Sequence, residues 1–285
     1  MTKSNIFNLR LYSWIDLILI GLIAKSSIEK SLEFSTKDII LAICLVSLWI
    51  FFNLILELKH SYEYRAKPKL VFTIIFLLIP LIIGLYFNYY TAIFSLTSTF
   101  FILLYLQKNK NQLFGNCSFV IRGLIQSQYY LYALMFYSHS INLTQILIIL
   151  TIFLLSSARS IIGDIRDYKH NKESSKKTIV VNLGINKSVI IILSLFILSI
   201  ITLLFISKST LLIFPVILFA LIIIFYRNGY ILHQVSITLT SFVSINLILF
   251  FTNGNLFFSD IIFTGILLNM IFYPLLERKS NPRFE

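Results

Sequence analysis

The stretch NLTQILIILTIFLLSSARSIIGDIRDYKHN, residues 142–171, decides the fold of this chain. Residues 142–163 are largely apolar and long enough, as a helix, to cross a hydrocarbon core about 30 Å thick. In lipid, every backbone N–H and C=O group must be satisfied internally, so such a segment is a helix. The polar residues from 164 onwards then mark the end of a membrane span.

Similar apolar runs recur along nearly the whole chain of 285 residues, of which 58% are hydrophobic and only 13% charged. A soluble domain carries about 25% charged residues, and these runs lack the alternation of a transmembrane barrel. We predict an all-α, polytopic transmembrane bundle of nine or ten helices around a central cavity, in a single domain over residues 1–285. The candidate spans are 11–28, 38–58, 70–86, 91–106, 113–137, 142–163, 187–206, 210–226, 231–252 and 257–276.

The net charge of +12 comes from basic residues that lie between the apolar runs. On a soluble protein such a charge would suggest nucleic acid, whereas here it follows the positive-inside rule, and we predict no nucleic-acid partner. With ten spans and a cytoplasmic N-terminus, the basic loops fall on one side, including 59–69 and 164–187. We therefore predict a multi-pass protein of the cell membrane with these loops in the cytoplasm.

Polar residues lie along one face at the end of the span 38–58. Asn53, Glu57 and Ser61 are spaced at i, i+4 and i+8, so they share one side of a helix. Hydrogen bonds between helices would explain Asn53 and Ser61. A carboxylate on the same stripe, Glu57, instead favours a cation, because ionisable residues within spans usually face a bundle interior or an aqueous cavity.

A second polar group follows residues 142–163. Asp164, Asp167 and Asn171 are spaced at i, i+3 and i+7, again on one helical face. They could form a solvated helix end in which Asp pairs with Arg166 or Lys169. Acidic residues oppose the macrodipole at a helix C-terminus, however, so another partner should favour them there.

Two carboxylate-bearing faces that open to one side, ringed by Lys and Arg, suit a particular ligand. Mg²⁺ prefers oxygen ligands and commonly bridges carboxylates to substrate phosphates. The surrounding cations would neutralise a diphosphate, and the apolar bundle would hold a hydrocarbon tail. This arrangement suggests ionisation of an allylic diphosphate, with attack on the carbocation by an acceptor.

At this point the sequence resembles the UbiA superfamily of intramembrane prenyltransferases. The second motif of that family is matched by DIRDYKHN, residues 164–171, and by the downstream KTIVVNLG, residues 177–184. The first motif is matched more loosely by NLILELKHS, residues 53–61, with Lys67-Pro68 after it; Glu57 and Ser61 stand where the family has Asp. Tyr105 with Lys108 is a weaker match.

The resemblance implies a Mg²⁺-dependent prenyltransferase that moves a polyprenyl group from a prenyl diphosphate to a small acceptor, aromatic or other. The residues that it implies as catalytic are Asp164, Asp167 and Glu57. The implied metal ligands are Glu57, Asp164, Asp167, Asn53 and Asn171. The implied substrate-binding residues are Asn53, Arg65, Lys67, Lys108, Arg159 and Asn171. Because Ser61 and Asn171 are neutral, we expect one firm Mg²⁺ site on Asp164 and Asp167, and a second that forms only with diphosphate bound.

Two other functions remain open from the residues. A relative with the same fold could cyclise the prenyl diphosphate or do no chemistry, because the first motif departs from the family pattern. A transporter would use the polar cluster as a substrate or proton site, but its helices tend to be broken at the midplane, and Pro80, Pro215 and Pro274 lie away from the acidic clusters. The basic residues could also be headgroup anchors. The sequence leaves the acceptor, the prenyl chain length and the oligomeric state open.

Overall fold

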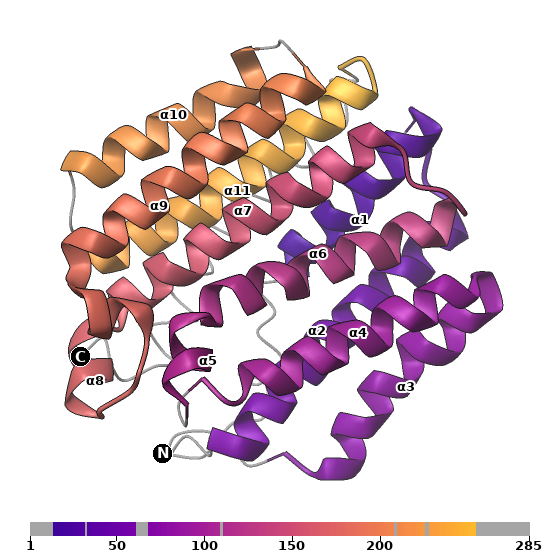
Figure 1. The fold of residues 1–285 in the computed structure, drawn as a ribbon. Coiled ribbons are helices and arrows are strands. Elements are labelled where there is room, and N and C mark those ends of the chain that lie inside the picture. Colours follow the sequence, from indigo (N-terminus) through magenta and orange to yellow (C-terminus); the bar gives the residue numbers. More distant parts are fainter. Residues whose placement is uncertain are drawn as a thin grey trace. The chain divides into compact units, whose positions relative to one another are not determined.

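The computed structural model describes residues 14–31, 33–60, 68–108, 111–207, 210–225 and 228–254, and within them the chain is helical, without any β-strand. The all-α prediction is confirmed. The helices are α1 (Trp14–Glu29), α2 (Thr36–His60), α3 (Leu70–Phe87), α4 (Tyr89–Tyr105), α5 (Gln112–Asn116), α6 (Ser118–Tyr137), α7 (Leu143–Arg166), α8 (Tyr168–Glu173), α9 (Ile179–Ile206), α10 (Thr210–Phe225) and α11 (Gly229–Phe251) (Figure 1).

Every predicted span from 11–28 to 231–252 contains a helix. Among the described residues, 5 helices are long and apolar enough to cross a membrane: α2, α3, α7, α9 and α11. The chain is therefore a multi-pass membrane protein. The count of nine or ten spans stays a prediction, since 257–276 lies outside the described residues and the remaining helices are shorter or less apolar.

The chain divides into two compact units. The first unit comprises residues 1–99, 129–139 and 248–285, and the second comprises residues 100–128 and 140–247. The helices α4, α6 and α11 each contribute residues to both units. Whether the whole chain acts as one domain, as the sequence predicts, stays a prediction.

In the first unit, α2 packs against α1 and α3. Buried residues make up 61% of the apolar window of α2 but only 17% of that of α3. The apolar surface of α3 is therefore the part of this pair available to lipid, and α2 is an interior helix. Ser47, Asn53 and Glu57 within this helix are buried, as the rule for intramembrane polar side chains predicts.

A buried ion pair explains why α1 carries charge in an apolar span. Nζ of Lys25 lies 2.5 Å from Oδ2 of Asp38 at the start of α2, and the two side chains are 3% and 5% exposed. The Tyr137 hydroxyl donates to the other Asp38 oxygen, and the Ser35 N–H donates to Oδ2. Because both oxygens of the buried Asp38 carboxylate are hydrogen-bonded within the unit, this cluster stabilises the contact between α1 and α2.

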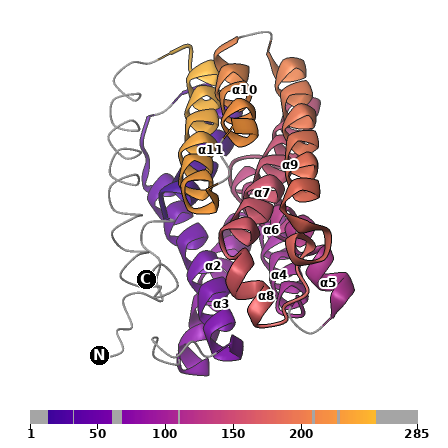
Figure 2. The same cartoon turned by 90° about the vertical axis from the view of Figure 1, so that its left-hand side faces the viewer.

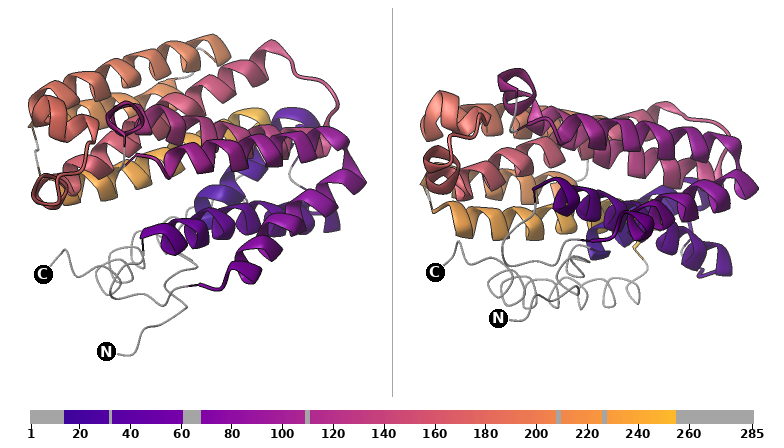
Figure 3. Two further views of the ribbon diagram at one scale, coloured as in Figure 1. Left: turned by 60° about the horizontal axis from the view of Figure 1, so that its bottom comes forward. Right: turned by 90° about the horizontal axis from the view of Figure 1, so that it is seen from below.

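In the second unit, α7 lies along α9, and α9 lies along α10 (Figures 1, 2 and 3). A capping box starts α7: Asn142 Oδ1 accepts from the Gln145 N–H at 3.0 Å, and Gln145 Oε1 accepts from the Asn142 N–H at 2.8 Å. These bonds satisfy backbone donors that the first turn leaves open. The register of α7, and so the position of its polar end, is thereby fixed.

A kink interrupts α9 near its start. Gly184 has φ +81°, a backbone conformation that residues other than glycine rarely adopt. Thr178 caps the short segment before the kink, with its hydroxyl accepting from the Val181 N–H at 3.4 Å. The sequence KTIVVNLG is thus a capped turn of helix that ends in an obligatory glycine.

Candidate active site

Asp164 lies in the last turn of α7 and is 5% exposed. The helix ends at Arg166, and α8 begins after Asp167, which has φ −90° and ψ 11°. The Asn171 N–H still donates to the Asp167 carbonyl at 2.8 Å. Asp164 therefore lies at the end of α7 and Asn171 on α8, with Asp167 between the two helices, and Asn171 is 4% exposed.

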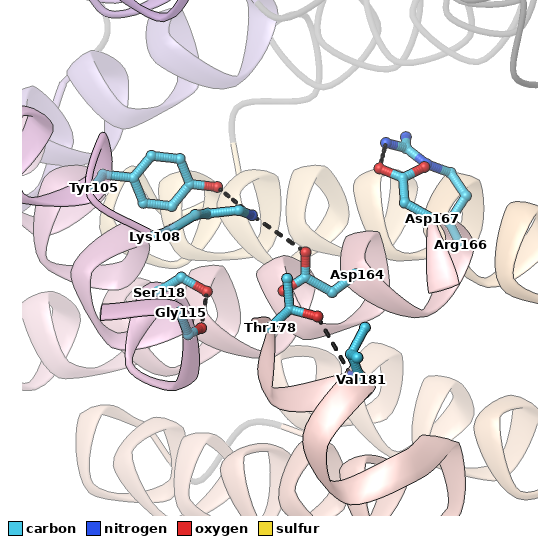
Figure 4. Close-up of polar contacts among 9 residues, drawn as sticks. All are labelled: Tyr105, Lys108, Gly115, Ser118, Asp164, Arg166, Asp167, Thr178 and Val181. Carbon is cyan, nitrogen blue, oxygen red and sulfur yellow. Dashed lines mark hydrogen bonds and ion pairs between the residues drawn. The ribbon is translucent and has the colours of Figure 1, made fainter. Parts of the chain in front are cut away.

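Lys108 lies in the turn after α4 and reaches Asp164. Its Nζ atom is 3.3 Å from Asp164 Oδ1 and 3.3 Å from the Tyr105 hydroxyl oxygen (Figure 4). Nζ also lies 5.1 Å from the centroid of the Tyr105 ring. The Tyr-x-x-Lys spacing thus places the ammonium group between a phenol and a carboxylate of the second unit.

Burial and charge act in opposite directions on Lys108. Burial lowers the pKa of the ammonium group, but the Asp164 carboxylate and Tyr105 together raise that pKa above its ordinary value. Lys108 is consequently a fixed positive charge at neutral pH. A cation held in this way can neutralise an anion that approaches Asp164.

The second carboxylate oxygen of Asp164, Oδ2, is buried and has no hydrogen-bond partner among the described residues. A buried oxygen without a partner costs about 1–3 kcal/mol, and more when it is charged. Such an atom therefore calls for a donor or a cation from outside the described part of the chain. Lys108 satisfies one side of the carboxylate and leaves the other available.

Asp167 forms a different contact. Its Oδ1 lies 3.0 Å from Arg166 Nε, and its Oδ2 lies 3.0 Å from Arg166 Nη2, a two-bond fork. Figure 4 shows this pair apart from the Lys108–Asp164 pair. The pairing of an aspartate with Arg166, which the sequence left open, is thus found for Asp167.

Both arginines of α7 contact α11. Arg166 Nη1 lies 3.2 Å from His233 Nδ1, and Arg159 Nη1 donates to the Thr240 hydroxyl at 3.1 Å. The resemblance implied Arg159 as a substrate-binding residue, and the structure shows it in contact with Thr240. Sequence reasoning assigned no role to His233. Like Glu57, however, it is an ionisable residue within a predicted span, 231–252, and such residues usually face the bundle interior.

Tight packing of α5 against the backbone of Lys108 and Lys177 supports the Lys108 turn. A Cβ atom on Gly115 would lie 1.8 Å from the carbonyl oxygen of Lys177 and 2.9 Å from that of Lys108. The Gly115 carbonyl accepts from the Ser118 hydroxyl at 2.8 Å (Figure 4). Only glycine lets α5 lie this close to both segments, so Gly115 holds the Lys108 turn against the start of α9.

The first-motif residues lie on α2 in the first unit. Asn53 is 0% exposed and Glu57 is 1% exposed. The Asn53 amide donates to the Trp49 carbonyl at 2.8 Å, while its Oδ1 has no hydrogen-bond partner among the described residues. Ser61, Arg65 and Lys67 lie outside the described residues. Because Asn53 and Glu57 belong to the first unit and Asp164 to the second, a shared ion stays a prediction.

The donor atoms fit Mg²⁺ by their chemistry. Asp164 Oδ2 and Asn53 Oδ1 are hard oxygens, buried and without partners in the described part of the chain. No group of three or more His, Cys, Asp or Glu residues gathers as a metal site within the described residues. Mg²⁺ is commonly held by one or two carboxylates together with substrate phosphates, so a sparse protein donor set suits an ion that arrives with a diphosphate.

Fold and polar cluster together define a class: a multi-pass helical membrane protein with buried carboxylates at the ends of its spans. The sequence pattern of the UbiA prenyltransferase family matches residues 61–236. This match covers more than half of the chain, and the chain belongs to that family. No curated protein matches the chain significantly by sequence.

Solved structures with this fold include a UbiA homologue from Archaeoglobus fulgidus, with TM-score 0.70 and 14% identity over 87% of this chain and 98% of that chain. A UbiA homologue from the same organism bound to GPP and Mg²⁺ has TM-score 0.57 and 12% identity over 85% and 98%. A structure of digeranylgeranylglyceryl phosphate synthase has TM-score 0.67 and 16% identity over 87% and 97%. At these identities the likeness concerns the fold.

Proposed function

We propose that this protein is a Mg²⁺-dependent prenyltransferase that moves a polyprenyl group from a prenyl diphosphate to a small acceptor, aromatic or other. The observation that carries the proposal is Asp164. Its carboxylate is buried at the end of a membrane-spanning helix, and it has a protein cation on one oxygen and no described partner on the other. Family membership supports the reaction class, and the solved homologue with GPP and Mg²⁺ supports the ligand class.

The chain's own residues would act as follows. Asp164 and Asp167, with Glu57, Asn53 and Asn171, would hold the ion. Lys108 would contact the diphosphate, and Arg65, Lys67 and Arg159 complete the proposed set of substrate-binding residues. Bound Mg²⁺ would supply positive charge that stabilises the departing diphosphate.

Lys108 has a specific part in this proposal. Its ammonium group has three N–H donors and contacts two acceptors, Asp164 and Tyr105, so a diphosphate oxygen is a further anionic acceptor for the same group. A protonated lysine next to the leaving group lowers the cost of its developing charge. The electron pair of the C–O bond leaves with the diphosphate, and the acceptor supplies the pair for the new bond at the allylic carbon.

The membrane setting follows from the same proposal. The prenyl tail would lie among apolar helices, and the diphosphate would enter from the side on which the basic loops lie. By the positive-inside rule, that side is the cytoplasmic face of a cell membrane.

The test is to incubate the purified protein in detergent with Mg²⁺, labelled prenyl diphosphates of several lengths and a panel of acceptors. The panel should include an aromatic acid, a quinone precursor and a glycerol phosphate. We expect a prenylated product from the wild type and none from Asp164→Ala. Absence of any Mg²⁺-dependent product or diphosphate release with every pair would reject the proposal.

A cyclase or catalytically altered relative is the alternative, favoured by Glu57, which stands where the family has Asp. The same assay separates the two functions. Release of diphosphate without prenyl transfer to any acceptor would indicate cyclisation or hydrolysis, and the lipid product would then show which.

A further inference from the structure

His233 lies beside Arg166 of the second motif, and the proposed function gives it no part. Its Nδ1 lies 3.2 Å from Arg166 Nη1, and its Nε2 lies 3.5 Å from the same atom. A guanidinium group is only a donor. The contacting ring nitrogen must therefore be an acceptor, and the imidazole is neutral in this contact.

The guanidinium of Arg166 contacts both Asp167 and His233. Its Nε and Nη2 atoms hold the two oxygens of Asp167, each at 3.0 Å, and its Nη1 atom points to His233. A planar group fixed at both ends has a set orientation, in contrast to an exposed ion pair that samples many geometries. The Asp167 carboxylate, whose side chain is 16% exposed, is held in a fixed orientation by this guanidinium group.

Backbone packing shows that His233 is held close to Arg166. A Cβ on Gly229 would lie 2.8 Å from the Arg166 Cα, so the first turn of α11 touches the last turn of α7. One helical turn later, His233 Cδ2 lies 3.6 Å from the place where a Cβ on Gly163 would stand. Gly229 and His233 therefore share the face of α11 that meets the end of α7.

A second arginine of α7 makes a similar contact with α11. Arg159 stands seven residues before Arg166, and Thr240 stands seven residues after His233. Arg159 Nη1 donates to the Thr240 hydroxyl at 3.1 Å. Arginine-to-acceptor bonds thus join α7 to α11 at both positions, and the bond to His233 involves the arginine that also holds Asp167. Thr240 supplies a matched control.

We propose that His233 is a positioning residue for the metal site: it orients Arg166, and Arg166 orients the Asp167 carboxylate for the divalent ion. This inference rests on the proposed function, because it takes Asp167 as a ligand. Residues that hydrogen-bond to metal ligands typically contribute 10- to 100-fold to metal affinity or activity. His233 would act through this route without touching the ion or the substrate.

The experiment measures binding of Mn²⁺ to the purified full chain in detergent, with inorganic diphosphate present and free Mn²⁺ read by electron paramagnetic resonance. We expect His233→Leu to weaken Mn²⁺ binding by about 10- to 100-fold. His233→Gln, which keeps an acceptor for Arg166, should stay within about threefold of the wild type. Thr240→Val, which removes the other acceptor, should also leave the affinity within about threefold.

Arg166→Lys is a second variant in case His233→Leu does not fold. It keeps the charge but cannot hold both Asp167 oxygens and His233 together, so its Mn²⁺ affinity should fall by a similar factor. Thermal unfolding in detergent identifies which variants are folded.

Three results would overturn the inference. They are wild-type Mn²⁺ affinity in folded His233→Leu, wild-type affinity in Arg166→Lys, or equal losses in His233→Leu and Thr240→Val. In each of these cases the proposed function stands, because the wild type still binds the ion. If the wild type bound no Mn²⁺ with diphosphate, the metal dependence in the proposed function would fail, and the role of His233 would fail with it.

Discussion

Nζ of Lys108 lies 3.3 Å from Oδ1 of Asp164 and joins the turn after α4 to the last turn of α7. The two side chains are 17% and 6% exposed, so the pair is largely removed from water. A lysine that the sequence assigned to the substrate thus has a carboxylate partner within the chain. The predictions on Lys108 and Asp164 follow from this contact.

Replacing Asp164 with Asn keeps the shape of the side chain and removes its charge. We expect kcat for prenyl transfer to fall by about 100-fold or more, a loss typical for one group that stabilises developing charge. Single-turnover kinetics with labelled prenyl diphosphate measure this loss. Glu173→Gln removes an acidic charge from an exposed side chain of α8 and should leave kcat unchanged. Wild-type kcat in Asp164→Asn would exclude the proposed role.

Replacing Lys108 with Met removes the ammonium group but keeps most of the apolar stem. We expect KM for the prenyl diphosphate to rise by about 10- to 100-fold, which corresponds to a charged hydrogen bond of about 1.5–3 kcal/mol. Lys169→Met removes the basic group of an exposed side chain of α8 and serves as the control for net charge. If both variants raised KM equally, Lys108 would contribute only to the general positive field.

The chemical reactivity of Lys108 should reflect its raised pKa. A folded-state pKa above the unfolded value means that the ion pair stabilises the fold at all pH values below about 10.4, the ordinary lysine pKa. That stability is lost only as the pH rises through the higher folded-state pKa. Between pH 7 and 9.5, acylating reagents should therefore modify Lys169 and Lys172 well before Lys108, as read by peptide mass spectrometry. Early modification of Lys108 would contradict the sign of the shift.

Gly115→Ala should destabilise the second unit. The added Cβ would meet the Lys177 carbonyl oxygen at 1.8 Å and force backbone to move. Overpacking of this kind costs about 1–3 kcal/mol and sometimes more. In Gly163→Ala, the added Cβ would lie 3.6 Å from its nearest neighbour, an ordinary contact. Thermal unfolding in detergent should show a lower Tm for Gly115→Ala only; equal Tm values would show that α5 adjusts freely.

Lys25→Met should destabilise the first unit, because it leaves Asp38 buried without its cation. Breaking one partner of a buried pair costs about 3–5 kcal/mol. Adding Asp38→Asn to the same chain removes the unbalanced charge and should recover part of the loss. The free energies of unfolding of the single and double variants in detergent check this coupling. Simple additivity would show that the two residues stabilise the fold independently.

Local sequence was enough to predict the helices. Apolar length and the need to satisfy backbone groups in lipid fix each span without reference to any other part of the chain. Asn142 with Gln145 starts α7 by local bonds, and Gly184 allows a positive φ that other residues rarely adopt. The buried state of Asn53, Glu57 and Asp164 also agrees with the rule that intramembrane polar groups avoid lipid.

Pairing between distant residues could not be predicted in the same way. Spacing placed Asp164, Asp167 and Asn171 on one helical face, but it could not show that the helix breaks at Asp167. Spacing also could not pair Lys25, within the predicted span 11–28, with Asp38, which neutralises its charge across the α1–α2 contact.

The sequence by itself determined an all-helical membrane protein and the two acidic motifs of its family, because hydrophobic length and helical periodicity are local properties. Tertiary structure alone decided that Lys108 pairs with Asp164 and that His233 lies beside Arg166. Ion pairs depend on which helix ends pack together, and packing brings together residues that are 56 to 67 positions apart in the chain.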